Sequence, residues 1–293
     1  MKTIERVFGD FKQNLSKLYD VREIEAVALL TITEICNLSK SKIKAFPELE
    51  LSQQQAEKLN DTLIQLQTGK PIQYILGKTE FYGLPFYVNP SVLIPRPETE
   101  ELVEWAVSSV GSWQLAVGSI LDIGTGSGCI AISLKKNLPG FDVSAVDISK
   151  AALQTAKTNA ELNAVNIDFV EADILNLSTQ SSLISNLQSP ISILISNPPY
   201  VTLHDKSKMH TNVTDFEPHS ALFVPEDDPL IFYKVIADFA IKNLTPNGQL
   251  FFEINESYGN DVVKLLADKG FKNIELRKDM SGRDRMVRSV IGH

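Results

Sequence analysis

The sequence predicts an α/β protein with a central, mostly parallel β-sheet. Four apolar runs are typical of buried strands, at residues 119–123, 142–146, 167–170 and 191–195, and helical patterns follow the first two. Each run ends at a glycine or a polar side chain. Because parallel strands bring their carboxyl ends to one edge of a sheet, we expect the residues that follow these runs to line one ligand site.

A glycine-rich loop follows the first predicted strand. It consists of Gly124, Thr125, Gly126, Ser127 and Gly128. Glycines let the backbone turn tightly and approach a ligand closely at the start of a helix. The next residue is Cys129, where a nicotinamide-dinucleotide loop requires glycine or alanine, so the spacing indicates a different nucleotide loop. Alone, such a loop is also compatible with a purely structural turn.

Two aspartates follow the next two strands. Asp147 ends the second strand, at about the distance expected of a carboxylate that accepts both hydroxyls of a ribose. Asp173 follows the third strand and is an acceptor suited to the amino group of adenine. Each aspartate alone is more typical of a solvated strand end or a helix cap. Their order along the chain favours one nucleoside site.

The fourth strand ends in a stiff polar turn, Asn197-Pro198-Pro199-Tyr200. The two prolines fix their own φ angles at about −65° and restrict the preceding residues, so the Asn197 side chain is held in one direction. Its side-chain oxygen and the Pro198 carbonyl can each accept one hydrogen of a planar –NH₂ group. This arrangement suits methylation of an amide or amine nitrogen, although the same tetrapeptide alone is often only a strand-ending turn.

This ordered series resembles the class I, S-adenosylmethionine-dependent methyltransferases that carry an Asn-Pro-Pro-Tyr signature. Further segments closely resemble the peptide chain release factor N5-glutamine methyltransferases, the HemK/PrmC family: 69–77, 81–84, 92–100, 216–218, 221–222 and 281–285. The resemblance covers the chain from about residue 69 to residue 290. It implies a Rossmann-like fold with a seven-stranded, mostly parallel sheet, a small N-terminal helical bundle and a linking β-hairpin.

The resemblance also implies a reaction and a set of site residues. The methyl group would pass from S-adenosyl-L-methionine, leaving S-adenosyl-L-homocysteine, to the glutamine side-chain nitrogen (N5) in a Gly-Gly-Gln motif of peptide chain release factors. Cofactor-binding positions are Gly124, Thr125, Gly126, Ser127, Gly128, Asp147, Asp173, Ile174 and Asn197. Substrate-binding positions are Arg96, Glu98, Asn197, Pro198, Pro199 and Tyr200. Among them, Asn197, Pro198 and Tyr200 are expected to be catalytic, with the Tyr200 ring forming a wall of the pocket.

The chain is expected to consist of three successive parts, each with its own type of structure. Residues 1–70 show helical apolar periodicity from Ile4 to Leu18 and capping-box spacings at Asp20 and Ser52, which predict a small helical bundle. Residues 71–95 predict a linking β-hairpin, and residues 96–293 form the methyltransferase domain. A role of the bundle in docking the protein substrate is implied by the resemblance only.

Composition excludes several functional classes. The chain has 293 residues, 43% hydrophobic and 22% charged, and a net charge of −8, which disfavours direct binding of nucleic acid because such binding depends on neutralising phosphates. It lacks a long apolar run and a secretory start, so we expect a cytoplasmic protein with no membrane partner. We also expect a monomer. Two distant cysteines and scattered histidines predict no metal site.

Two other functions share parts of this pattern. Adenine-N6 methyltransferases of DNA or RNA use the same Asn-Pro-Pro-Tyr turn, but they need a basic target-recognition region, which this acidic chain with its helical N-terminus does not offer. A non-catalytic partner protein could keep the fold as a scaffold. The intact glycines, Asp147 and Asn197 disfavour that alternative.

Overall fold

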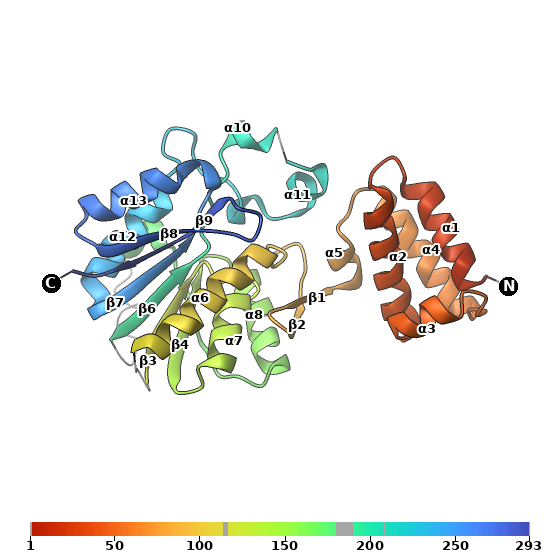
Figure 1. Cartoon of the computed structure of the whole chain (residues 1–293), viewed down its shortest axis with the longest axis horizontal. Coiled ribbons are helices and arrows are strands. Elements are labelled where there is room, and N and C mark those ends of the chain that lie inside the picture. Colours follow the sequence, from red (N-terminus) through yellow and green to blue (C-terminus); the bar gives the residue numbers. More distant parts are fainter. Residues whose placement is uncertain (1, 114–116, 180–189, 208, 293) are drawn as a thin grey trace. The chain divides into compact units, whose positions relative to one another are not determined.

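The computed structural model describes residues 2–113, 117–179, 190–207 and 209–292. The chain divides into two compact units (Figure 1). The first contains the residues up to Gly77 together with 210–216, and the second contains 78–209 and the chain from Glu217 onward. Each unit has its own hydrophobic core.

The first unit is helical. Its helices are α1 (Ile4–Leu15), α2 (Val21–Cys36), α3 (Lys40–Ala45), α4 (Gln53–Gln67), α5 (Ile72–Leu76) and α11 (Thr211–Phe216). The predicted capping box is present at the start of α4, where Ser52 and Gln55 each bond the other's backbone N–H. The apolar pattern from Ile4 to Leu18 extends beyond helix α1. The helix ends at Leu15, and Leu18 is 45% exposed.

The second unit is built on a seven-stranded sheet. Its strands are β3 (Gly118–Ile123), β4 (Phe141–Asp147), β5 (Asp168–Glu171), β6 (Ile191–Ser196), β7 (Leu244–Glu253), β8 (Lys272–Lys278) and β9 (Asp284–Val290). Their order is β5-β4-β3-β6-β7-β9-β8, with β9 antiparallel to both neighbours and the other pairs parallel. The prediction of a mostly parallel seven-stranded sheet is confirmed.

Helices cover both faces of this sheet (Figure 1). One face packs against α12 (Ile231–Asn243) and α13 (Gly259–Asp268). The other packs against α6 (Pro97–Trp113), α7 (Cys129–Asn137) and α8 (Lys150–Leu162). The shorter elements are α10 (Leu203–Lys206), η1 (Ile174–Thr179), η2 (His219–Ala221) and η3 (Glu256–Tyr258). Within the described ranges, no helix has the length and apolar character needed to cross a membrane.

The topology fixes where a ligand can bind. From β3 the chain builds outward through β4 and β5, then returns to place β6 on the other side of β3. Adjacent strands whose connections run in opposite directions leave a crevice at their carboxyl ends, where open α/β sheets bind ligands. Strand pairing sets Ile123 beside Ser196, so the glycine loop and the Asn-Pro-Pro-Tyr turn start side by side.

A short hairpin, β1 (Lys78–Phe81) and β2 (Leu84–Tyr87), belongs to the second unit and is attached to α8 by a buried amide. Asn159 of α8 accepts a hydrogen bond from the Tyr87 N–H at 2.7 Å and donates to the Tyr87 carbonyl at 3.0 Å. It also donates to the Ser127 carbonyl in the glycine loop at 2.9 Å. One side chain therefore joins the hairpin, a helix and the loop.

We predict that Asn159→Ala destabilises the second unit by about 1–3 kcal/mol, because it leaves buried backbone groups without partners. Both tryptophans of the chain lie in α6, so urea denaturation followed by tryptophan fluorescence reports this unit. Lys157→Ala, an exposed change on the same helix, is the matched control and is expected to stay within about 0.5 kcal/mol of wild type. Equal stabilities of the two variants would contradict the anchoring role.

Candidate active site

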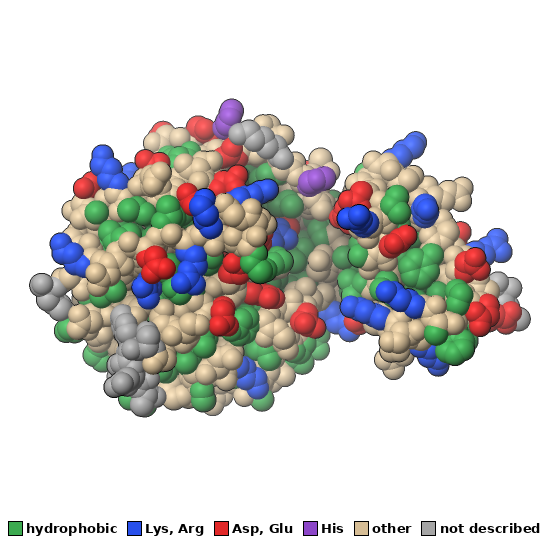
Figure 2. All heavy atoms as spheres, in the orientation of Figure 1, with side chains coloured by type: hydrophobic (Ala, Val, Ile, Leu, Met, Phe, Trp, Pro, Cys, Tyr) green, Lys and Arg blue, Asp and Glu red, His purple; other side chains and the backbone are tan. Residues whose placement is uncertain are grey.

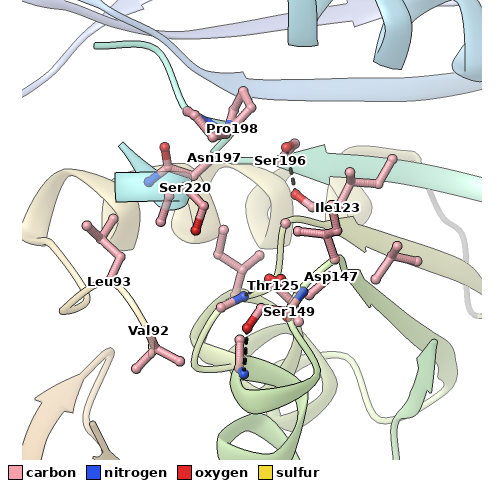
Figure 3. A pocket seen from close by; sticks show the side chains of 18 of the residues that line it. Val92, Leu93, Ile123, Thr125, Asp147, Ser149, Ser196, Asn197, Pro198 and Ser220 are labelled. Atoms are coloured by element: carbon pink, nitrogen blue, oxygen red, sulfur yellow. Dashed lines mark hydrogen bonds between the residues drawn. The ribbon is translucent and has the colours of Figure 1, made fainter. Parts of the chain in front are cut away.

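A cavity of about 280 Å³ lies at the carboxyl ends of the central strands (Figure 3). Its walls come from the residues that follow β3, β4, β5 and β6, and from the segment 91–99 that leads into α6. The predicted site residues that line it are Arg96, Gly124, Thr125, Gly126, Ser127, Asp147, Asp173, Ile174, Asn197, Pro198 and Pro199. The structure thus brings together residues that the sequence spreads over about a hundred positions.

The glycine loop needs its glycines for two different reasons. Gly124, Gly126 and Gly128 have φ angles of +76°, +55° and +82°, which L side chains rarely adopt. A Cβ atom added at Gly124 or Gly126 would meet nothing within 4 Å, so both positions open onto free space. A Cβ at Gly128 would lie 3.0 Å from Ile132 and 3.1 Å from Ala156, so this glycine serves the packing of two helices.

Asp147 ends β4 at the cavity wall and is held by backbone N–H groups. One carboxylate oxygen accepts from Gly126 and the other from Ser149, each at 2.8 Å. Burial raises the pKa of Asp147, and these backbone hydrogen bonds oppose that effect. The carboxylate is therefore fixed against the glycine loop, with lone pairs left for further hydroxyl donors.

Asp173 and Ile174 line the cavity beyond β5. The Asp173 carboxylate accepts a hydrogen bond from the Leu175 N–H at 2.9 Å and another from the Asn176 side-chain amide. These contacts cap the short helix η1 and aim the carboxylate at one end of the cavity. Ile174 is buried beside it and supplies apolar surface.

Asp122 is a buried carboxyl group next to the glycine loop, and the strand pattern of the sequence did not single it out. It is fully buried in β3 directly before the glycine loop, and it accepts a hydrogen bond from the Thr125 hydroxyl at 2.6 Å. Burial raises its pKa to about 7, while hydrogen bonds from Thr125 and the Ala131 backbone act in the opposite direction. A lone aspartate within the apolar run 120–123 was the signal that could have found it.

The Asn197 side chain is oriented by a chain of hydrogen bonds. Its amide nitrogen donates to the Thr99 hydroxyl oxygen at 3.1 Å, and that hydroxyl donates to the buried carboxylate of Glu253 at 2.6 Å. At the base of the turn, Ser196 donates from its hydroxyl to the Ile123 carbonyl at 2.7 Å (Figure 3). Glu253 was not predicted as a site residue, and Thr99 was expected only as part of the loop from Arg96 that lines the cavity.

Three predicted site residues lie outside the described cavity wall. The Tyr200 hydroxyl donates to Glu253 at 3.0 Å and its ring packs on the apolar core, so the expectation that the ring walls the pocket is not met. Burial raises the pKa of Tyr200 far above the ordinary value. Glu98 lies in the first turn of α6, and Gly128 faces the neighbouring helices.

Arg96 is held at the cavity by an ion pair with Glu217. Its guanidinium lies 2.5 Å from one carboxylate oxygen, and the other oxygen accepts from the Ile94 N–H at 3.2 Å. The Glu217 side chain is 1% exposed, whereas that of Arg96 is 33% exposed. Glu217 therefore fixes the segment that leads into α6 and leaves Arg96 accessible from the cavity.

Comparison with known proteins identifies the family. Residues 112–216 match the Methyltransferase small domain, and residues 10–77 match the PrmC N-terminal domain. The chain is 47% identical to the release factor glutamine methyltransferase of Flavobacterium psychrophilum, over 95% of each chain. It is 39% identical to that of Bacteroides thetaiotaomicron, over 97% of this chain and 99% of the relative.

The chain belongs to the release factor glutamine methyltransferase family. Among solved structures, it shares the fold of a Pyrococcus furiosus methyltransferase, with a TM-score of 0.51, 15% identity and coverage of 73% of this chain and 91% of the other. The predicted family is confirmed along almost the whole chain, including the N-terminal helices. The cavity described above is therefore the candidate active site of a protein methyltransferase.

The remaining candidates for chemistry are structural or unassigned. Cys129 is buried at the start of α7, and burial raises the pKa of its thiol to about 12. Within the ranges that the structure describes, no group of three or more His, Cys, Asp or Glu residues could hold a metal ion.

We predict that Cys129 resists alkylation in the native protein. Burial raises the pKa of this thiol, so only a small fraction of it is ionised at pH 8, and the thiolate is the reactive form. Mass spectrometry after iodoacetamide treatment at that pH should find Cys129 unmodified unless denaturant is present. The unfolded protein, alkylated in parallel, is the control, and modification at similar rates in both states would contradict the burial of this thiol.

Proposed function

We propose that the protein transfers a methyl group from S-adenosylmethionine to the side-chain nitrogen (N5) of the glutamine in the Gly-Gly-Gln motif of peptide chain release factors. The orientation of Asn197 carries the proposal: its amide nitrogen is occupied by Thr99, which leaves its side-chain oxygen free to accept a hydrogen from a substrate –NH₂ group. The names of the relatives supply the substrate class.

The lining of the cavity supports S-adenosylmethionine as the cofactor. Gly124 and Gly126 leave open space where any side chain would intrude, so a ligand can approach the backbone at the start of α7. Asp147 would accept the two ribose hydroxyls, and Asp173 would accept from the adenine amino group, with Ile174 against the ring. Thr125, Ser127 and Gly128 complete the loop that holds these positions.

Residues of the turn would act on the substrate nitrogen. When bound, the cofactor supplies an electrophilic methyl group and leaves as S-adenosylhomocysteine. Asn197 and the Pro198 carbonyl would hold both hydrogens of the glutamine amide and stabilise positive charge that develops on its nitrogen. Pro199 keeps the turn rigid, and the hydrogen bond from the Tyr200 hydroxyl to Glu253 holds the end of the turn in place. Such positioning is worth about 7–11 kcal/mol of the barrier in favourable cases.

Other parts of the chain would bind the protein substrate. Arg96 is accessible beside the cavity, and Glu98 follows it in the first turn of α6, so both are candidates for contacts with the release factor. We propose that the domain formed by residues 1–70, joined through 71–95 to the methyltransferase domain 96–293, docks the release factor; the match of residues 10–77 to the PrmC N-terminal domain supports a separate N-terminal domain. A monomer in the cytoplasm is the proposed form.

Methylation of adenine is the alternative reaction for the same turn. Figure 2 shows Lys and Arg side chains interspersed with Asp and Glu side chains on the face in view, rather than gathered into one basic surface. The net charge of −8 also opposes binding to phosphates. Relatives that match over nearly the whole chain carry the release factor name, which supports a protein substrate and not a nucleic acid.

We predict that Asp147→Ala weakens S-adenosylmethionine binding more than tenfold, because hydrogen bonds to a charged group contribute about 1.5–3 kcal/mol. Isothermal calorimetry on the purified protein gives the affinity directly. Asp142→Ala, an exposed change on the same strand, is the control and should leave the affinity unchanged. Unchanged affinity in Asp147→Ala would remove this residue from the cofactor site.

We predict that Asn197→Ala loses about a hundredfold or more in kcat while cofactor affinity changes little, because it removes an acceptor used mainly in the transition state. Single-turnover transfer of a radiolabelled methyl group to release factor measures the loss. Adenine-containing DNA is the parallel substrate, and label appearing on DNA but not on release factor would refute the proposed function. Near-normal transfer by Asn197→Ala would show that this turn is not the active site.

A further inference from the structure

Glu253 is a buried carboxylate that touches the active site only through other side chains. It ends β7 and is 1% exposed. One of its oxygens accepts from Thr99 at 2.6 Å and the other from Tyr200 at 3.0 Å. Burying a charge costs free energy unless the charge is well paired. A buried glutamate beside the Asn-Pro-Pro-Tyr turn therefore indicates a function that compensates for this cost.

The hydrogen-bond directions in this group are fixed by chemistry. An ionised carboxylate only accepts, so the Thr99 hydroxyl must use its single hydrogen on Glu253. The Thr99 oxygen is then available only as an acceptor. The side-chain atom of Asn197 that lies 3.1 Å from it must therefore be the –NH₂ nitrogen, and not the carbonyl oxygen.

The two ends of an amide differ in chemistry but hardly in shape. A flipped Asn197 would fit the same space, yet it would present –NH₂ to the substrate –NH₂, a pairing of two donors. Packing alone therefore does not select the productive orientation. The Glu253 carboxylate, which accepts hydrogen bonds and cannot donate one, selects this orientation of Asn197 through the Thr99 hydroxyl between them.

We propose that Glu253, acting through the Thr99 hydroxyl, is a positioning residue that fixes which end of the Asn197 amide faces the substrate nitrogen. This inference rests on the proposed function, since it concerns the acceptor for a substrate –NH₂ group. Tyr200 occupies the other carboxylate oxygen and so holds Glu253 in place. The Tyr200 carbonyl in turn accepts from the Asn255 side chain at 3.2 Å, which ties the turn to the residues beyond β7.

The surroundings of Glu253 act on its pKa in opposite directions, and the effect of burial is the largest. Burial raises the pKa of Glu253, whereas the hydrogen bonds from Thr99 and Tyr200 and the positive charge of Arg285 lower it. Arg285 is itself paired with the buried carboxylate of Asp279 at 3.3 Å. The carboxylate is thus supported by two donors and a nearby cation rather than by solvent.

The test compares conservative changes along this path. Thr99→Val keeps the shape of the side chain but removes the hydroxyl, and Glu253→Gln keeps the volume but adds donor hydrogens. We expect each to lower kcat for release factor at least tenfold, with KM and S-adenosylmethionine affinity within about threefold of wild type. Thr99→Ser restores the hydroxyl and should keep kcat within about threefold of wild type.

A double variant separates positioning from general stability. If both residues act through one path, Thr99→Val with Glu253→Gln should lose no more kcat than the worse single variant. Ser109→Ala removes another buried hydroxyl from the same helix, where it donates to the Trp105 carbonyl, and should lower thermal stability without lowering kcat.

Two results would overturn the inference. Wild-type kcat in Thr99→Val would show that the hydroxyl does not orient Asn197, whether or not Glu253→Gln folds. Multiplicative losses in the double variant would show independent roles. Failure of the wild-type protein to methylate release factor at all would refute the proposed function instead, so the two failures are distinguishable.

Discussion

The parallel pairing of β6 with β3 is the constraint on which the rest of the site depends. It sets Ser196 beside Ile123, and the Ser196 hydroxyl bonds the Ile123 carbonyl at 2.7 Å. Because the glycine loop starts directly after Ile123 and the Asn-Pro-Pro-Tyr turn directly after Ser196, this register sets the distance between the proposed cofactor and substrate sites. A shift of one residue would also exchange the buried faces of the strand, so the sheet core and the site specify the same register.

Around this register, three carboxylates that already have hydrogen-bond partners hold the segments that form the cavity. Asp147 is bonded by backbone N–H groups, Glu217 by Arg96 and a backbone N–H, and Glu253 by two hydroxyls. Each carboxylate holds a different segment in place: the glycine loop, the segment before α6 and the Asn-Pro-Pro-Tyr turn. Such pre-formed contacts need no rearrangement as charge develops during the reaction, which is how fixed dipoles stabilise a transition state.

The sequence predicted the features that depend on neighbours along the chain. The strands, the glycine loop and the aspartates after the strands follow from local patterns, and the family likeness extended them to the full sheet. The contacts that connect distant segments were missed: Thr99 meets Glu253 across 154 positions, and Asn159 meets Tyr87 across 72. A lone threonine in a helix and a lone glutamate at a strand end carry no periodic signal. From the sequence, Tyr200 was expected to form a wall of the pocket, and only the structure shows that its hydroxyl bonds to Glu253.

The arrangement also explains why a buried glutamate beside the turn need not act as a base. Both oxygens of Glu253 are occupied, and Thr99 stands between it and Asn197, so it has no path to the substrate nitrogen. A carboxamide nitrogen is a poor nucleophile because its lone pair is delocalised, and it becomes acidic only once it carries the new methyl group. Its proton can then leave to solvent after transfer. Before transfer, the proposed mechanism requires an acceptor held in one orientation, and the proposed path from Glu253 through Thr99 to Asn197 would supply it.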